Sequence, residues 1–345
     1  MQEAQSAYEL EKTGELHNAE QMRQQAIKSL QSLAKLDRLH FAVGAQSCAR
    51  AFAIAGKHEE ARTLLSEAWH AIERNPGHHA AVLRHRLLHT AGKININEEK
   101  YLDAKQHFDY AATIAADVFG KDSDDYGRTL SLLGLAEMKL DEINDAQRHL
   151  TQAEAILSTK LGDNADETIS IRIYTANLFC IERDFDAALP ILLKAVDQLK
   201  NTSSGSRLHL NSRILLAKVH VEKGDLQAGE EILVEIIAAT NAKDLQKEWI
   251  VAQGTLAKVY RLKGDLERAR AILDVALSAA REHDPTGLDT AGLLHESALL
   301  ALASGDQISA ARDVEEAILI ASAKLKPTHR NVVEYNQTKN TIHAR

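Results

Sequence analysis

The chain has 345 residues, of which 45% are hydrophobic, 26% are charged and only 4% are aromatic. This composition is typical of a soluble helical protein with enough apolar residues for a core. The formal net charge of −8 argues against direct nucleic-acid binding, which needs a basic surface. No apolar run is long enough to span a membrane, so we expect a cytoplasmic protein without membrane insertion.

A small residue returns eight times along the chain, at intervals of 40 to 43 residues. We call this column the first anchor. Its members are Ala19, Ala61, Ala104, Ala146, Ala188, Gly229, Ala269 and Ala310. A period of this length is typical of a solenoid, in which stacked units bury a core that no single unit could bury alone.

Two further columns of small residues divide each repeat into two helices. One column follows the first anchor by seven residues, as Ala111 follows Ala104, and therefore lies on the same face of a helix. The other precedes it by twelve residues, as Gly92 does, and belongs to an earlier helix. Large residues such as Phe108 stand between these columns and are expected to pack against the small ones. Each repeat is thus predicted to be helix A, a tight turn and helix B.

The turn position lies five residues before each first anchor. Three copies carry Glu99, Asp141 or Arg183 there. The other five carry a glycine, namely Gly14, Gly56, Gly224, Gly264 and Gly305. We expect helix A to end at this residue in a left-handed conformation, which glycine adopts most easily.

In chain order, the repeats are expected at about 1–39, 40–80, 81–121, 122–163, 164–205, 206–245, 246–287 and 288–327. Residues 328–345 then form a capping helix with a polar outer face, and residues 1–345 form a single domain. The first residues already have the pattern of helix A without a preceding cap, which favours a chain cut from a longer protein. Cys48 and Cys180 fall near helix A packing positions, so we expect buried structural thiols in a reducing compartment.

The small, large, small pattern of helices A and B resembles the tetratricopeptide repeat. The segments Phe-Gly-Lys-Asp at 119–122 and Leu-Gly-Asp-Asn at 161–164 resemble the end of kinesin-light-chain-type repeats. Ser123 and Ala165 stand where that pattern has His, so motor binding is not carried over. The resemblance implies an all-α, right-handed solenoid that binds other proteins.

The sequence carries no motif of a known catalytic site. It contains no phosphate-binding glycine loop, no nucleophile elbow and no dinucleotide fingerprint, so we expect neither an enzyme nor a cofactor. His85 and His89 are four residues apart and could share a metal ion. The intervening residues include no Glu, and Arg84 and Arg86 would repel a cation, so we predict no metal site.

In tetratricopeptide folds, the concave surface is lined by residues 18, 15, 11 and 7 positions before the first anchor. Here the charged residues at these positions in repeats two to seven are basic, with Glu222 as the only acid. The predicted peptide-binding residues are Arg50, Arg86, His89, Lys93, Asn97, Arg128, Lys139, Asn177, Lys218 and Lys258. Such a groove would attract an acidic peptide or a terminal carboxylate, whose backbone Asn97 and Asn177 could bind. The simpler alternative is a water-exposed helix face whose charges happen to be basic.

These observations favour a noncatalytic interaction scaffold, or the sensor part of a larger regulatory protein, that binds a peptide in its concave groove. An alternative is a receptor that binds a peptide or a small anion and switches an attached output domain. Oligomeric state and partner identity stay open, because repeats define a scaffold and recognition lies in its variable surface.

Overall fold

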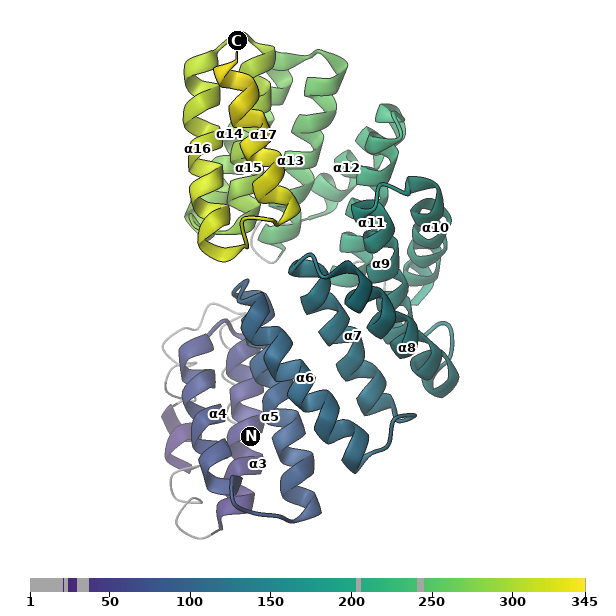
Figure 1. Ribbon diagram of the computed structural model, residues 1–345, viewed down its shortest axis with the longest axis vertical. Helices are drawn as coiled ribbons and strands as arrows, with labels where there is room; N and C mark the ends of the chain where they lie inside the picture. The colour runs from purple at the N-terminus through teal and green to yellow at the C-terminus, as the bar shows by residue number, and fades with distance from the viewer. Residues whose placement is uncertain (1–20, 22–23, 30–36, 203–205, 241–244, 345) are drawn as a thin grey trace. The chain divides into compact units, whose positions relative to one another are not determined.

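The computed structural model describes residues 21, 24–29, 37–202, 206–240 and 245–344. Every regular element in these residues is an α-helix, as predicted (Figure 1). Most of the predicted first repeat, including Gly14, lies outside the described residues. The helices are α3 (Arg38–Ile54), α4 (His58–Ile72), α5 (His78–Asn97), α6 (Tyr101–Val118), α7 (Asp124–Lys139), α8 (Ile143–Leu161), α9 (Asp166–Ile181), α10 (Phe185–Thr202), α11 (Arg207–Glu222), α12 (Leu226–Ala239), α13 (Gln246–Lys263), α14 (Leu266–His283), α15 (Leu288–Ala303), α16 (Gln307–Lys324) and α17 (Arg330–His343).

The chain forms two compact units. Unit 1 comprises residues 1–139 and 151–160, and unit 2 comprises residues 140–150 and 161–345. In unit 1, α3 packs on α4 and α5 packs on α6, with α5 also touching α3. In unit 2, the pairs α9 and α10, α11 and α12, α13 and α14, and α15 and α16 pack in the same way. Odd-numbered helices from α3 to α15 are therefore the A helices, and even-numbered ones are the B helices.

The turn residue between helices A and B is left-handed in all seven described repeats, which confirms the prediction. The φ angle is 75° at Gly56, and it is 80° to 85° at the three later glycines of this column. It is 60° at Glu99, 65° at Asp141 and 63° at Arg183, where a side chain makes this conformation costly by about 1–2 kcal/mol. The chain reverses direction there through backbone hydrogen bonds across the turn, such as the one from Lys57 N–H to the Phe52 carbonyl at 2.8 Å.

The core consists of the predicted small and large columns. Ala61 and Ala104 are fully buried, and Phe108 is fully buried between its neighbours. The Phe108 ring fills the space beside Gly92, because a Cβ atom added to Gly92 would lie only 2.6 Å from that ring. A small residue in helix A therefore makes room for a large one in helix B, and the two backbones approach closely.

The last helix, α17, covers the end of unit 2, where the sequence predicted a cap. It packs on α15 and α16 and buries Val332, Tyr335 and Ile342. The Tyr335 ring lies 4.5 Å from the ring of His295, measured between centroids, and the His295 Nε2 atom lies 2.9 Å from the Thr338 hydroxyl. In the described part of the chain, no helix is long and apolar enough to cross a membrane.

Substituting Gly92 tests the close packing of helices A and B. We expect Gly92→Ala to lower the free energy of unfolding by about 1–3 kcal/mol, because the new methyl group overlaps the Phe108 ring. Gly292→Ala is the matched control, since its Cβ atom would meet only the Tyr335 hydroxyl at an ordinary 3.9 Å. Replacing this helical glycine by alanine should stabilise the protein by about 0.5–1 kcal/mol. Urea unfolding followed by circular dichroism measures both changes, and equal changes of the same sign would contradict the packing description.

Candidate functional site

Six of the predicted peptide-binding residues line one cavity in unit 1, with a volume of about 890 Å³. We call it the unit 1 groove. It is formed by the A helices α3, α5 and α7. The predicted residues in its lining are Arg50, Arg86, His89, Lys93, Asn97 and Arg128. Four of them follow one another on α5 at spacings of three or four residues, which places their side chains on one face of the helix.

The groove also contains residues that the sequence analysis did not select. His85 and Thr90 of α5 and Asp125 of α7 belong to its lining. Asp125 is the one carboxylate among the described residues of this lining. It stands in the first turn of α7, three positions before Arg128, so the column rule did not include it.

His85 forms part of the groove lining and is only 4% exposed. Its Nε2 atom lies 2.9 Å from the Thr129 hydroxyl oxygen, and that hydroxyl lies 2.7 Å from the Asp125 carbonyl. Because the hydroxyl donates its proton to the carbonyl, it accepts a hydrogen bond from His85 Nε2–H, which fixes the tautomer. The other ring nitrogen, Nδ1, is buried and has no hydrogen-bond partner.

His89 was predicted as a potential cation, but its surroundings oppose this charge. Its ring lies edge-on to Phe108 with 5.8 Å between centroids. Burial lowers the pKa of His89 to about 3, and the nearby Lys93, His85 and Arg128 add to this effect. At neutral pH His89 is therefore an uncharged side chain beneath the cations of the groove.

Three of the remaining cations of the groove, Arg50, Arg86 and Lys93, have no neutralising partner in the described part of the chain. Among the residues that the structure describes, no carboxylate lies within ion-pair distance of Arg50, Arg86 or Lys93. Burial lowers the pKa of the Lys93 ammonium group, and the positive charges of Arg50 and Arg128 lower it further. Arg128 itself is paired with Asp124 at 2.8 Å. Within the described residues, the groove thus contains three cations without an acidic partner, a setting where an anion would be favourable.

The predicted residues of unit 2 have a different environment. Lys258 Nζ lies 2.5 Å from Glu222, so the expected free cation is neutralised by the one acid of the predicted column. Arg261 and Glu296 pair in the same way at 2.5 Å between Nε and Oε1. Asn177 of α9 is half-buried.

Lys218 and Lys139 complete the predicted set. Lys218 of α11 exposes much of its side chain. Burial by the surrounding protein still lowers its pKa, Asp289 opposes this shift and Lys258 adds to it. Lys139 is the last residue of α7 and is not part of the unit 1 groove lining.

The two cysteines show no sign of reactivity. Cys48 is completely buried, and Cys180 is partly buried. Burial raises the pKa of the Cys180 thiol to about 11, so the thiolate form needed for reaction is scarce at neutral pH. Both thiols therefore fit the structural role that the sequence predicted.

A second cavity lies on the side of unit 1 formed by the B helices. It has a volume of about 590 Å³ and lies between α4 and α6, with Leu87 and Leu88 of α5 in its lining. Trp69 and Tyr110 meet across it at 6.2 Å between ring centroids. The sequence analysis missed this cavity because it followed the A helices.

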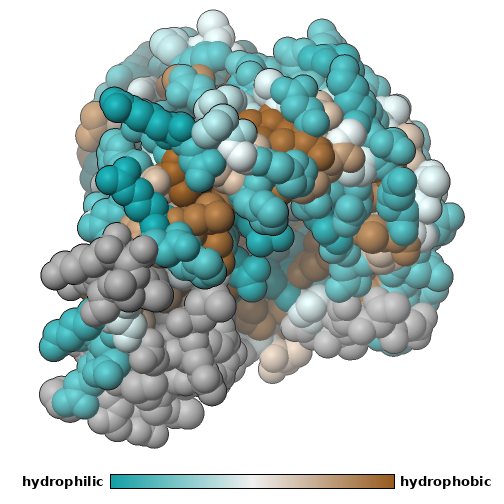
Figure 2. Space-filling model, turned by 90° about the horizontal axis from the view of Figure 1, so that it is seen from below, coloured by the Kyte–Doolittle hydropathy of each residue, from teal (hydrophilic) through white to brown (hydrophobic). Residues whose placement is uncertain are grey.

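On the face that Figure 2 shows, hydrophilic residues cover most of the described surface, and hydrophobic residues form brown patches between them.

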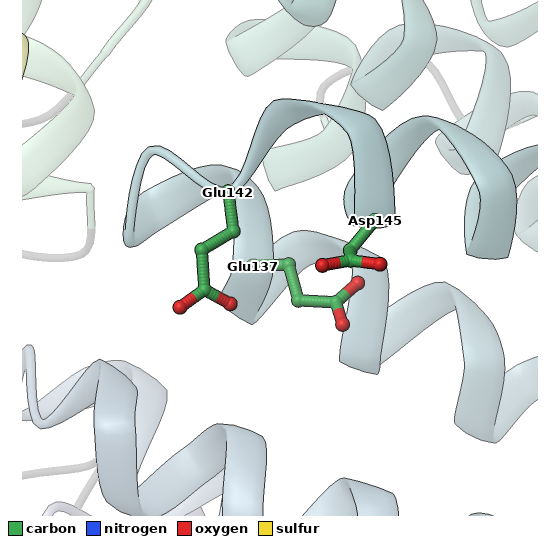
Figure 3. Close-up of side chains that lie close together, drawn as sticks. All are labelled: Glu137, Glu142 and Asp145. Atoms are coloured by element: carbon green, nitrogen blue, oxygen red, sulfur yellow. The ribbon is translucent and has the colours of Figure 1, made fainter.

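Three acidic side chains lie close together around the turn that follows α7 (Figure 3). Oxygen atoms of Glu137, Glu142 and Asp145 lie within 4.8 Å of one another, which is a spacing that a metal ion can use. Carboxylates gather in this way on many proteins without an ion, so this spacing alone assigns no metal. The His85 and His89 rings, with centroids 5.7 Å apart, instead contact Phe119 and Phe108.

Solved structures show the same fold. The chain is similar to NprR in complex with its cognate peptide NprX, with a TM-score of 0.70, 14% identity and 96% of each chain covered. A Rap protein complexed with Competence and Sporulation Factor gives a TM-score of 0.66 and 14% identity, with 99% of this chain and 96% of that chain covered. BtubC from P. vanneervenii gives 0.52 and 16%, with 62% of this chain and 86% of that chain covered. No family model and no curated protein sequence matches the chain.

These likenesses, together with the repeats, confirm the predicted fold class. The chain is an all-α protein built from helix-turn-helix repeats, and its fold is similar to that of these solved structures. At these levels of identity the comparison concerns the fold, and the groove is described by its own residues.

The neutral state of His89 predicts an acid-sensitive contribution to stability. The pKa of His89 is about 3 in the folded protein, below the ordinary value of 6.5. As the pH falls through 6.5, the His89 imidazole is therefore protonated only in the unfolded chain. Stability is therefore lost from about pH 6.5 down to about pH 3. We expect the stability difference between wild type and His89→Gln to shrink by roughly 2 kcal/mol from pH 7 to pH 4.5. Urea unfolding at both pH values measures this, and an unchanged difference would show that His89 titrates normally.

Proposed function

We propose that the protein is a noncatalytic peptide-binding sensor or scaffold whose unit 1 groove binds an acidic peptide segment. The observation that carries this proposal is the cluster of Arg50, Arg86 and Lys93, which line one groove and have no carboxylate within ion-pair distance among the residues that the structure describes. A ligand carboxylate would supply the missing negative charge and form charge-assisted hydrogen bonds with these side chains. Because the cations lie on neighbouring A helices, a ligand that contacts all of them must span the groove.

The form of the groove supports a peptide as its ligand. Its volume of about 890 Å³ accommodates several residues of an extended chain, whereas a small anion would occupy only the space between the cations. Exposed Asn97 at the end of α5 carries both a donor and an acceptor, which suits the backbone of such a chain. Exposed Ile54 of α3 adds an apolar contact in the same lining.

Several proteins of the same fold have been solved with peptides. They include NprR with its cognate peptide NprX, and the Rap conjugation gene regulator of the plasmid pLS20 with the Phr* peptide. The latter has a TM-score of 0.63 and 14% identity to this chain. These complexes support a peptide ligand for the present chain, while the preference for acidic residues rests on its own cations.

A second candidate is a receptor that binds a peptide or a small anion and switches an attached output domain. The lowered pKa of Lys93 favours any ligand that brings negative charge, including a small anion. The two candidates differ in the ligand contacts they need. A small anion depends on the cations of the groove, whereas a peptide also depends on Asn97.

Charge reversal in the groove tests the proposed site. The probes are three pools of fluorescent twelve-residue peptides with randomised sequences that are rich in acidic, neutral or basic residues. We expect the acidic pool to bind best, and we expect Arg50→Glu with Lys93→Glu to weaken this binding by about tenfold or more. Arg128 is left unchanged, because its reversal would also place a carboxylate beside Asp124. Fluorescence anisotropy at low and high salt measures the affinities.

The matched control is Arg38→Glu with Lys121→Glu, which changes the net charge equally. Both residues belong to unit 1, are exposed and lie outside the groove lining. Equal loss of binding in the control and groove variants would mean that net charge, and not the groove, attracts the peptides. Asn97→Ala and competition by inorganic sulfate then separate a peptide ligand from a small anion.

A further inference from the structure

Two segments of unit 2 that are distant in sequence meet at the beginning of α17. The Arg330 guanidinium donates from Nη1 to Asp141 Oδ1 at 2.5 Å, and the Arg330 backbone N–H donates to Asp141 Oδ2 at 3.2 Å. Nearby, Lys326 Nζ lies 3.4 Å from Glu142 Oε1. Asp141 and Arg330 are 189 residues apart in the chain, so this contact joins the first and last segments of unit 2.

The position of Asp141 makes this contact more than an incidental surface ion pair. Asp141 occupies the left-handed turn position, with φ of 65°, where four of the other described repeats have glycine. A side chain at this position is unfavourable for the local backbone, although Asp tolerates it better than most residues. Here the Asp141 carboxylate accepts a hydrogen bond from a backbone N–H in the first turn of α17.

The carboxylate lies where the backbone of α17 favours an anion. The first N–H groups of a helix have no partner within the helix, and the helix dipole places partial positive charge at this end. His329 satisfies one of these groups through its Nδ1 atom, which lies 3.2 Å from the Asn331 N–H. Asp141 satisfies the Arg330 N–H, so the cap of α17 is completed from outside the helix.

The bonds in this contact are polar and partly accessible to solvent. The side chains of Arg330 and Asp141 are 36% and 25% exposed, and those of Lys326 and Glu142 are 56% and 23% exposed. The buried apolar residues of α17 pack within the C-terminal part of unit 2, where this helix contacts α15 and α16. Ion pairs of this kind are weakened by salt and contribute little when exposed, so the contact can open while α17 stays folded on its neighbours.

We propose that Arg330, Lys326, Asp141 and Glu142 form a reversible, salt-sensitive latch that closes unit 2. The A helices between its two sides are α9, α11, α13 and α15, which carry Asn177, Lys218 and Lys258. The latch would control the access of a ligand to these A helices of unit 2.

Hydrogen–deuterium exchange of the whole chain tests the latch directly. Asp141→Asn keeps a residue that tolerates the left-handed turn and removes the charge. We expect amides in residues 326–334 to exchange about fivefold faster or more in this variant, and in the wild type when NaCl is raised from about 0.05 M to about 1 M. Arg183→Asn is the matched control, because Arg183 has a φ of 63° at the same turn position of another repeat. It should exchange like the wild type in this segment.

A charge exchange separates the ion pairs from general disruption. Glu142→Lys and Lys326→Glu should each accelerate exchange in residues 326–334, and the double variant should restore slow exchange. Unchanged exchange in every variant would show that the contact does not form in solution. If amide exchange is faster in the variants but salt does not change exchange in the wild type, the contact is a fixed structural one. This result would also overturn the proposal of a reversible latch.

Discussion

The structure depends on the close approach of helices A and B within each repeat, which is possible only where a small residue faces a large one. Gly92 and Phe108 show this constraint most clearly, since even one added carbon atom would overlap the ring. Repeating it at nearly constant intervals stacks the A helices of each unit side by side. A surface lined by one face of these helices follows from the packing, and the residues on that face are free to vary without disturbing the core.

The charge balance of this surface differs between the two units. In unit 2, cations pair with acids about one repeat away, as Lys258 does with Glu222 and Arg261 with Glu296. Such pairs connect neighbouring repeats, each with a modest contribution of about 1 kcal/mol or less. In the described part of unit 1, Arg50 and Lys93 have no such partners, and the neighbouring His89 is neutral. The positive potential is therefore concentrated in the unit 1 groove, although the whole chain is acidic.

The sequence predicted the fold in detail because the packing constraint recurs with a period. The left-handed turn at Arg183 could be placed without any glycine, since its position in the repeat determined it. The six predicted residues that line the unit 1 groove were selected by the same repeat rule. The pairing of Lys258 was not found, because it depends on which side chains of neighbouring repeats meet in space. The neutrality of His89 depends on burial against Phe108, and the contact of Asp141 with Arg330 depends on chain segments 189 residues apart. Neither feature can be recognised from the sequence of a single repeat.

The most direct test of the central claim is an NMR titration of the lysine side chains, with the Lys93 signal assigned through Lys93→Arg. Burial, together with the positive charges of Arg50 and Arg128, predicts that Lys93 has a pKa below the ordinary value of 10.5, and the account predicts that a bound acidic peptide raises it. An ordinary pKa for Lys93 that does not respond to the peptide would contradict the account. In that case the groove would be neutralised in solution, and recognition would lie elsewhere on the molecule.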